Sequence, residues 1–493
     1  MQLFNAKQIR EWDAFTIAHE PIRSIDLMER AAQACVEEIG KIFREKECFY
    51  IFCGKGNNGG DGLAIARLLY QKGREVTVFV VGSEKEGSSD FLTNEDRLKD
   101  IPIAVSFFKD RNYFPDIPYN AIVIDAIFGS GLNKPLKGFV AELVTFLNGV
   151  SNIKIAIDVP SGMYLDESSK NNIVLKADYT FTFQQLKFCF LLAENAPFLG
   201  KLSVLDIGLS KEYQPQESSI LEIVDLPFVQ KIYKPRNIYG HKGTFGHALL
   251  VAGNKGKMGA AVLAALGCLK SGVGLLTCNI PETESLIFPI AIPEAMTVWR
   301  NEEIDFEKYK SIGVGPGLGI AETSILKKIL DNAKSPLVLD ADALNMIALN
   351  PEWLSLIPAN SILSPHPKEF ERLFGKQENE VARIRKALEI SKQYDFMIIL
   401  KGHYTLVANQ GKGFFNTTGN AGMATGGSGD TLTGILTSLL AQGYSGLEGA
   451  ILGVFIHGLA GDLALTTESE ESLLPSDISN FLGSAFQKVN ARR

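Results

Sequence analysis

Cysteine and histidine are scarce in this chain, and neither is spaced as metal ligands usually are. Six cysteines are scattered over 493 residues without a Cys-x-x-Cys pair, and the six histidines show no ligand spacing. These absences argue against a zinc site and against a disulfide framework. They favour a reducing, cytoplasmic setting.

An excess of positive charge is also missing. The formal net charge is −7 and the pI is near 5.6, whereas a nucleic-acid partner would favour a basic face. The N-terminus has no basic segment followed by an apolar one, so we expect no signal peptide. The most apolar windows, 259–276 and 451–465, contain Lys270, His457 and Asp462. We expect buried helices there, and no membrane partner.

Short apolar runs alternate with amphipathic stretches along nearly the whole chain, which is typical of parallel α/β folds. At 493 residues the chain is too long for one ordinary core. Gln, Glu, Ser and Pro gather at 210–236 before a new glycine-rich start. We therefore predict one domain over 1–212, a linker over 213–235 and a second domain over 236–493. The predicted strands are 49–52, 76–81, 122–125, 153–158, 179–183, 248–252, 312–314, 337–340, 361–363 and 397–400.

The run Cys53-Gly-Lys-Gly-Asn-Asn-Gly-Gly-Asp-Gly62 joins an apolar, strand-like segment to a helix-like one. Its five glycines allow a close backbone approach to a ligand, and the following helix N-terminus is a natural anion site. Residues 54–59 also match Gly-x-Gly-x-x-Gly, so a dinucleotide fold is considered. No acidic residue is obviously placed to hold a ribose after the next strand.

Charged residues and glycines follow several predicted strands, and ligands of open α/β sheets bind at the carboxyl ends of strands. Four such residues should converge on one crevice: Asp61, Asp125, Gly129 and Asp158. A second set should converge on another crevice: 315–317, Asp340, His366 and Lys401. An aspartate after a strand can also simply cap a helix, and a glycine-rich turn can be only a tight connection.

The loops at 56–62, 125–135 and 156–162, with Leu27-Met-Glu-Arg-Ala31 upstream, resemble the YjeF N-terminal family. Members of this family are epimerases of hydrated NADH and NADPH. The resemblance implies a Rossmann-like three-layer α/β/α domain. The residues it implies for binding of the hydrate are Asn57, Asn58, Gly59, Gly60, Asp61, Gly129, Ser130, Gly131, Leu132, Asn133, Lys134 and Pro135.

The same resemblance implies a potassium ion held through oxygen atoms of Asn58, Asp125 and Ser161. Oxygen ligands suit such a hard cation. It also implies that Asp158 binds beside the substrate ring, where its carboxylate would move the proton that epimerisation requires. The family commonly continues Leu-Asp after Ser161-Gly162, whereas this chain has Met163-Tyr164. That departure leaves the local loop shape open.

A second glycine-rich run ends at Gly427-Ser-Gly-Asp430 and opens onto an apolar helix-like segment. Its backbone amides can hold a developing phosphate charge. The run lacks the Lys-Ser/Thr of a Walker A loop. It resembles the ribokinase-like superfamily, a resemblance that implies an α/β/α domain in which Asp430 activates an acceptor hydroxyl.

Four further segments, 241–246, 315–319, 365–369 and 401–405, make the second half similar to the ADP- or ATP-dependent NAD(P)H-hydrate dehydratase family. The reaction implied is phosphorylation of the ring hydroxyl and loss of phosphate, with Mg²⁺ neutralising charge. The residues implied for the hydrate are Ala260, Gly317, His366 and Asp430. Those implied for the adenine nucleotide are Lys401, Gly402, His403, Tyr404, Thr405 and Gly429.

Together the resemblances span nearly the whole chain and imply a bifunctional repair enzyme, an isomerase joined to a lyase. It would act on both epimers of hydrated NADH or NADPH and consume ADP or ATP, with ADP expected; a homo-oligomer is also expected. Two alternatives stay open: a hydroxymethylpyrimidine or thiazole kinase, which would leave phosphate on its product, and an N-terminal half that only binds a partner, for example RNA.

Overall fold

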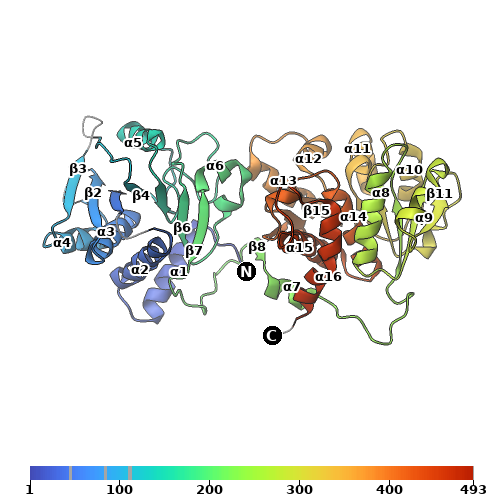
Figure 1. The fold of residues 1–493 in the computed structure, drawn as a ribbon, viewed down its shortest axis with the longest axis horizontal. Coiled ribbons are helices and arrows are strands. Elements are labelled where there is room, and N and C mark those ends of the chain that lie inside the picture. The colour runs from blue at the N-terminus through green and yellow to red at the C-terminus, as the bar shows by residue number, and fades with distance from the viewer. Residues whose placement is uncertain (44–46, 83–85, 109–113, 492–493) are drawn as a thin grey trace. The chain divides into compact units, whose positions relative to one another are not determined.

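The computed structural model describes residues 1–43, 47–82, 86–108 and 114–491. The chain forms two compact units (Figure 1). The first unit consists of Gln2–Ser219 with the short segment Asn379–Val381. The second consists of Met1, Ile220–Glu378 and the chain from Ala382 onward.

The first unit contains a seven-stranded sheet in the order β3-β2-β1-β4-β5-β6-β7, and all its strand pairs are parallel. The strands are β1 (Cys48–Cys53), β2 (Glu75–Val81), β3 (Ala104–Phe108), β4 (Ile122–Ala126), β5 (Lys154–Ile157), β6 (Tyr179–Phe183) and β7 (Lys201–Leu205). The helices are α1 (Ala6–His19), α2 (Ser24–Ile42), α3 (Asn57–Gln71), α4 (Ser89–Leu98), α5 (Gly138–Gly149) and α6 (Ala196–Leu199).

Alternate residues of these strands face opposite sides of the sheet and enter different cores. Ile51 and Ile124 pack with residues of α2 and α3 on one face. Phe52 and Val123 pack with residues of α5 on the other face. The unit is therefore the expected three-layer α/β/α domain.

The second unit contains a ten-stranded sheet in the order β11-β10-β9-β12-β13-β14-β15-β16-β17-β8. Only β16 runs antiparallel to its neighbours. The strands are β8 (Leu221–Val224), β9 (His247–Val251), β10 (Leu275–Ile280), β11 (Met296–Trp299), β12 (Ser311–Val314), β13 (Leu337–Leu339), β14 (Ile362–Leu363), β15 (Met397–Leu400), β16 (Leu406–Asn409) and β17 (Lys412–Asn416).

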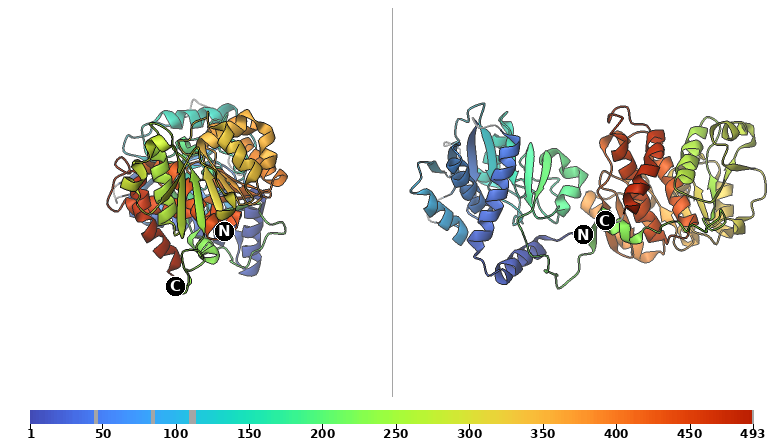
Figure 2. Two further views of the ribbon diagram at one scale, coloured as in Figure 1. Left: turned by 90° about the vertical axis from the view of Figure 1, so that its right-hand side faces the viewer. Right: turned by 60° about the horizontal axis from the view of Figure 1, so that its bottom comes forward.

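Helices of the second unit pack on this sheet, and residues of α14, α15 and α16 share a core with strand residues such as Val338 and Ile399. Figure 2 shows the same unit from two further sides. The helices are α7 (Leu226–Ile232), α8 (Met258–Lys270), α9 (Ile287–Ala291), α10 (Thr323–Asn332), α11 (Ala341–Leu349), α12 (Pro367–Phe374), α13 (Glu380–Gln393), α14 (Ser428–Ala441), α15 (Gly446–Ala464) and α16 (Pro475–Asn490).

Residues 221–232, which the sequence analysis assigns to a linker, form β8 and α7 instead. β8 pairs with β17 at the edge of the second sheet, and Ile223 and Val224 are buried there. Asp225 caps α7 by accepting a hydrogen bond from the backbone of Phe228 at 2.9 Å. The sequence analysis misses this strand because β8 is only four residues long and the residues around it are mostly polar.

The structure confirms a buried helix in the apolar window 451–465, whereas the window 259–276 is helical only in part. Of the residues described, only those of α15 form a helix long and apolar enough to cross a membrane by length and composition, and 78% of its apolar window is buried within the protein. The window 259–276 is not one helix, because α8 ends at Lys270 and β10 begins at Leu275.

The helices α8 and α14 pack side by side, so closely that their backbones approach each other (Figure 1). A Cβ atom added to Gly434 of α14 would lie 1.9 Å from the carbonyl oxygen of Ala264, and one added to Gly267 of α8 would lie 2.4 Å from that of Thr431. Glycine at both positions is therefore a packing requirement. This contact fixes the start of α14, which carries Asp430.

Replacing Gly434 by alanine should lower the free energy of unfolding by about 1–3 kcal/mol, because the added methyl group forces two backbones apart. Urea unfolding measures this. Gly483→Ala on α16 is the matched control: nothing lies within 4 Å of its added Cβ, so it should be neutral or slightly stabilising. Equal effects of the two substitutions would contradict the packing argument.

Candidate functional site

The order of the first sheet places β1 beside β4, and the chain leaves these two strands in opposite directions along the sheet. Such a switch point opens a crevice at the carboxyl ends of the strands. An added Cβ on Gly54 would lie 2.0 Å from the oxygen of Ile127, and one on Gly59 would lie 1.8 Å from the oxygen of Gly54. Gly54 thus allows the loops after β1 and β4 to touch, and Gly59 allows the loop after β1 to turn tightly into α3.

Asp125, at the end of β4, is fully buried and ties this loop to the one after β5. Ser161 donates to it twice, through its Oγ at 2.6 Å and its backbone N–H at 2.8 Å. The backbone N–H of Phe128 in turn donates to the Oγ of Ser161 at 2.9 Å. Burial raises the pKa of Asp125 to about 6, against the opposing effect of these hydrogen bonds.

Asn58 is the third residue, with Asp125 and Ser161, to which the resemblance assigns a potassium ion. Both its amide nitrogen and its amide oxygen are buried, and neither has a hydrogen-bond partner among the described residues. A Cβ on Gly129 would lie 3.2 Å from this oxygen and 3.0 Å from Oδ2 of Asp158. Asn58, Gly129 and Asp158 therefore meet, as the strand-end argument predicts for the latter two.

Asp158 follows β5 in a left-handed backbone conformation with φ 66°, which is uncommon outside glycine. Its Oδ1 lies 2.8 Å from the Nζ of Lys187, and its Oδ2 accepts from the backbone N–H of Ser130 at 3.0 Å. Burial alone would raise the pKa of Asp158, but the Lys187 charge and these hydrogen bonds hold it below its ordinary value. Asp158 is thus a buried but ionised carboxylate.

Two adjoining cavities open at this edge of the sheet, and Ser130 lines both. The smaller, of about 70 Å³, is lined by Asp158 and Lys187 among others. The larger, of about 210 Å³, is lined by 130–133 and by residues of α1 and of 164–167. The other residues implied for the hydrate, 57–61, Gly129, Lys134 and Pro135, are not among the described lining residues of either cavity. Burial in α3 raises the pKa of Asp61 well above its ordinary value.

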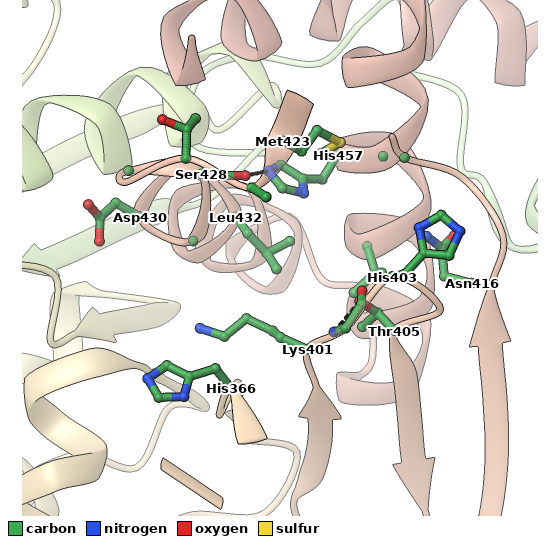
Figure 3. A pocket seen from close by; sticks show the side chains of 18 of the residues that line it. His366, Lys401, His403, Thr405, Asn416, Met423, Ser428, Asp430, Leu432 and His457 are labelled. Carbon is green, nitrogen blue, oxygen red and sulfur yellow. Dashed lines mark hydrogen bonds between the residues drawn. The ribbon is translucent and has the colours of Figure 1, made fainter. Parts of the chain in front are cut away.

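A cavity of about 810 Å³ lies at the carboxyl edge of the second sheet. In Figure 3, Asp430, Lys401 and His366 gather at one end of it, while His403, Thr405 and Asn416 lie at the other. Gly402 and Gly429 also line it. Ala260, Gly317 and Tyr404 are not among the described lining residues. A Cβ on Gly317 would lie 3.0 Å from that of Ala260, so these two residues lie next to each other.

A buried ion pair organises the Asp430 end of this cavity. Lys401 Nζ donates to Oδ1 of Asp340 at 2.7 Å, and the hydroxyl of Thr433 donates to Oδ2 at 2.9 Å. The lysine is thereby committed to Asp340. Burial raises the pKa of Asp430 to about 6, Asp340 adds to the rise and Lys401 opposes it. Asp430 is therefore ionised at neutral pH but poised to take up a proton.

The side chain of His366 is fixed by the start of α12. Its Nδ1 accepts hydrogen bonds from the backbone N–H groups of Lys368 at 3.1 Å and Glu369 at 3.3 Å. Burial lowers the pKa of His366, although Glu369 opposes this. The imidazole is therefore neutral, with its proton on Nε2, which lies 3.4 Å from Oε1 of Glu369.

The glycine-rich run before α14 lines the cavity on the side opposite Lys401 and His366 in Figure 3. Gly427 has φ 102°, so the chain turns sharply into the N-terminus of α14. Ser428 Oγ lies 3.3 Å from Nε2 of the buried His457 of α15. Asp462 holds the preceding loop by accepting from the backbone of Gly419 at 2.9 Å and from Asn420 at 3.1 Å. Ser428, Gly429 and Asp430 of the first turn of α14 line the cavity, and the N-terminus of a helix favours a bound phosphate.

Sequence reasoning does not identify Lys187 or His457 as members of these sites. Lys187 lies four residues beyond the end of β6, and a lysine just after a strand that borders the crevice is the only signal for it. Asp340 is predicted to converge with His366 and Lys401 from its place at a strand end, and the structure confirms that convergence.

Comparison with known proteins identifies the family. Residues 248–483 match the family model described as NAD(P)H-hydrate dehydratase, and residues 24–189 match the one described as YjeF-related protein N-terminus. The bifunctional NAD(P)H-hydrate repair enzyme Nnr of Moorella thermoacetica is 32% identical over 98% of this chain and 96% of its own length. The chain belongs to this family of bifunctional repair enzymes.

A second family member, from Escherichia coli K12, is 30% identical over 93% of this chain and 88% of its own length. Among solved structures, a ribokinase-like superfamily protein of Enterococcus faecalis V583 is 28% identical with a TM-score of 0.50. It covers 57% of this chain and all of its own. Family membership favours the repair-enzyme interpretation over the small-molecule kinase and over a non-catalytic N-terminal half.

Replacing Lys187 by methionine should destabilise the first unit by about 3–5 kcal/mol at neutral pH, because Asp158 would then be a buried charge without its partner. The folded-state pKa of Asp158 would rise above its unfolded value. The deficit should therefore shrink as the pH falls and Asp158 takes up a proton. Urea unfolding from neutral to mildly acidic pH measures this.

The control is Lys41→Met, which removes an exposed pair with Glu38 and should cost at most about 1 kcal/mol at any pH. The double variant Lys187→Met with Asp158→Asn should recover part of the lost stability. A Lys187→Met deficit that grows on acidification would contradict the assignment of an ionised Asp158.

Proposed function

We propose that the cavity at Asp158 is the epimerase site of this bifunctional enzyme and the cavity at Asp430 its dehydratase site. The observation that carries the proposal is that each unit has a cavity at the carboxyl edge of its own sheet, lined by Asp158 in the first unit and by Asp430 in the second. The first site interconverts the R and S hydrates of NADH and NADPH. The second converts the S hydrate to the intact dinucleotide.

In the epimerase site the ionised Asp158 acts as the proton acceptor during epimerisation of the hydroxyl-bearing ring carbon. The backbone of Ser130 and the Nζ of Lys187 hold its carboxylate in place, and its left-handed conformation aims it from the strand end. The larger adjoining cavity along 130–133 suits the rest of the nucleotide. Asn57, Gly60 and Asp61 lie at the start of α3, where a helix N-terminus favours phosphate.

A potassium ion fits the group formed by Asn58, Asp125 and Ser161. The buried amide oxygen of Asn58, which lacks a partner among the described residues, is the observation that supports it. Amide, carboxylate and hydroxyl oxygens are the ligands that a hard cation prefers. The ion would neutralise charge and tie the loops after β1, β4 and β5 together. Asp125 and Ser161 already join two of these loops.

In the dehydratase site Asp430 takes the proton of the substrate hydroxyl as that oxygen attacks the terminal phosphoryl group of the nucleotide. The N–H groups at the start of α14 stabilise the charge on the transferred group, and Lys401, which stays paired with Asp340, adds its positive charge at the same end of the cavity. His366 presents its neutral imidazole to the hydrate, beside Gly317 and Ala260. Phosphate then departs in place of hydroxide, which is a much poorer leaving group, and this explains why dehydration consumes a nucleotide.

The adenine nucleotide extends from Gly429, beside Lys401, to the far end of the cavity at Gly402, His403 and Thr405, with Tyr404 between the last two in the chain. We propose ADP as the physiological donor. Mg²⁺ is usually held by one or two carboxylates together with substrate phosphates. The carboxyl groups of Asp340 and Asp430 fit that donor set, since both line the cavity. The ion would neutralise the phosphates during transfer.

The acidic, cysteine-poor composition supports a cytoplasmic protein acting on small molecules. A homo-oligomer remains our expectation from the family resemblance.

Replacing Asp158 or Asp430 by asparagine should separate the two activities. Asp158→Asn should convert the S hydrate of NADH normally but leave the R hydrate behind, with epimerisation slowed about 10²–10⁴-fold. Asp430→Asn should still interconvert R and S, yet form no NADH from either. Chromatography of the epimers and the near-ultraviolet absorbance of NADH measure the two activities.

The matched control is Asp331→Asn on the surface of α10, which removes only an exposed pair with Lys327 and should change neither activity. Full epimerisation by a folded Asp158→Asn protein would contradict the first assignment. NADH formation at the wild-type rate by Asp430→Asn would contradict the second.

A further inference from the structure

A second carboxyl group, that of Asp13, lines the same small cavity as Asp158 and Lys187. It comes from α1, which precedes the residues matched by the family model. Ile9, Trp12 and Asp13 all line the cavity, and their spacing places them on one face of the helix. The cavity is therefore closed on one side by an element for which the sequence analysis gave no role.

The helix α1 is held firmly in this position. Asn5 and Gln8 form a reciprocal capping box at its start. The indole N–H of Trp12 donates to the carbonyl of Ser210 at 2.7 Å, and the backbone of Ser210 donates to the hydroxyl of Thr16 at 3.0 Å. Trp12 lies next to Asp13 in the chain, so its hydrogen bond holds in place the turn of the helix that carries Asp13.

The charges around the cavity do not balance. Among the described residues that line the cavity, Asp13 and Asp158 face one cation, Lys187, whose Nζ is 2.8 Å from Oδ1 of Asp158. Asp61 of α3, with Asp90 near it, adds further acidic groups to the surroundings. Burial raises the pKa of Asp13 to about 7; Asp158 adds to the rise, and Lys187 opposes it. Below about pH 7 the pair therefore holds one proton, on Asp13, beside an ionised Asp158.

Epimerisation of a hydrated nicotinamide needs both a proton donor and a proton acceptor. Water adds to an enamine at the carbon attached to nitrogen, so the hydroxyl-bearing carbon adjoins the ring nitrogen. That carbon inverts if its hydroxyl leaves and water returns on the opposite face. The departing oxygen must gain a proton, and the returning water must lose one.

We propose that Asp13 is the second acid–base residue of the epimerase site, the proton donor that works with Asp158. This inference rests on the proposed function of that site. The carbon–oxygen bond breaks, the hydroxyl leaves as water with the proton of Asp13, and the nitrogen lone pair forms a carbon–nitrogen double bond. Water then adds to the carbon and gives its proton to Asp158, and the double-bond electrons return to nitrogen. Transfer of that proton from Asp158 to Asp13 completes the cycle, with nothing consumed.

The test uses the full chain with the R hydrate of NADH and no nucleotide, so that only epimerisation occurs. Asp13→Asn should lower kcat about 10²–10⁴-fold with little change in KM. Because the asparagine removes the repulsion by Asp158, the variant should fold at least as stably as the wild type. Its rate on the S hydrate with ADP and Mg²⁺ should be unchanged. The matched control is Glu11→Gln, which makes the same kind of change on α1. Glu11 accepts a hydrogen bond from the hydroxyl of Tyr213, and its replacement should leave epimerisation intact.

The pH profile of the wild-type protein supplies an independent readout. Epimerisation should be fastest where the pair holds one proton and should fall as the pH rises through about 7, when Asp13 loses its proton. Wild-type kcat in Asp13→Asn, or a wild-type rate that does not fall above that pH, would overturn the proposal. If Asp158→Asn also kept full activity, the site itself would be wrong rather than only the role of Asp13.

Discussion

A lysine that neutralises a buried aspartate is the interaction on which both sites depend. Lys187 lies 2.8 Å from Asp158 in the first unit, and Lys401 lies 2.7 Å from Asp340 in the second. Removing either partner would leave a buried charge at a cost of several kcal/mol. Each lysine is committed to one carboxylate while another carboxyl group lies nearby. The pKa of that second group, Asp13 or Asp430, is raised to about 7 or about 6. Such separation of pKa values is how acid and base roles are divided in one site.

The separation of roles also accounts for the joining of two units in one chain. A hydroxyl-bearing carbon formed by unselective addition of water has both configurations, and a site that phosphorylates one configuration leaves the other behind. An epimerase that needs no nucleotide converts the configuration left behind into the one that can be phosphorylated. Each unit has its own sheet, its own switch of chain direction and its own cavity, so diffusion of the hydrate between the sites suffices.

Much of this could be predicted from the sequence, because parallel strands bring their following residues to one edge. All ten predicted strands exist, and Asp158, Asp430 and Lys401 lie at cavities there. The missed strands include the edge strands β3, β7 and β11, whose sequences are short and partly exposed. Asp13 and Lys187 could not be found in this way. They matter because the fold brings them to the same cavity as Asp158, although Asp13 is 145 residues and Lys187 is 29 residues away from it in the chain. Neither periodicity nor spacing predicts such a contact.

The most direct test of the whole account starts from the pure R hydrate of NADH. It is incubated with the full chain, K⁺, Mg²⁺ and ADP, while NADH and released inorganic phosphate are both measured. The account predicts that all of the R hydrate becomes NADH, with one phosphate released for each molecule. Removal of the nucleotide should leave a mixture of R and S with no NADH. An R hydrate that stays unconverted, while the same protein turns the S hydrate into NADH in a parallel reaction, would contradict the claim that one chain carries both activities.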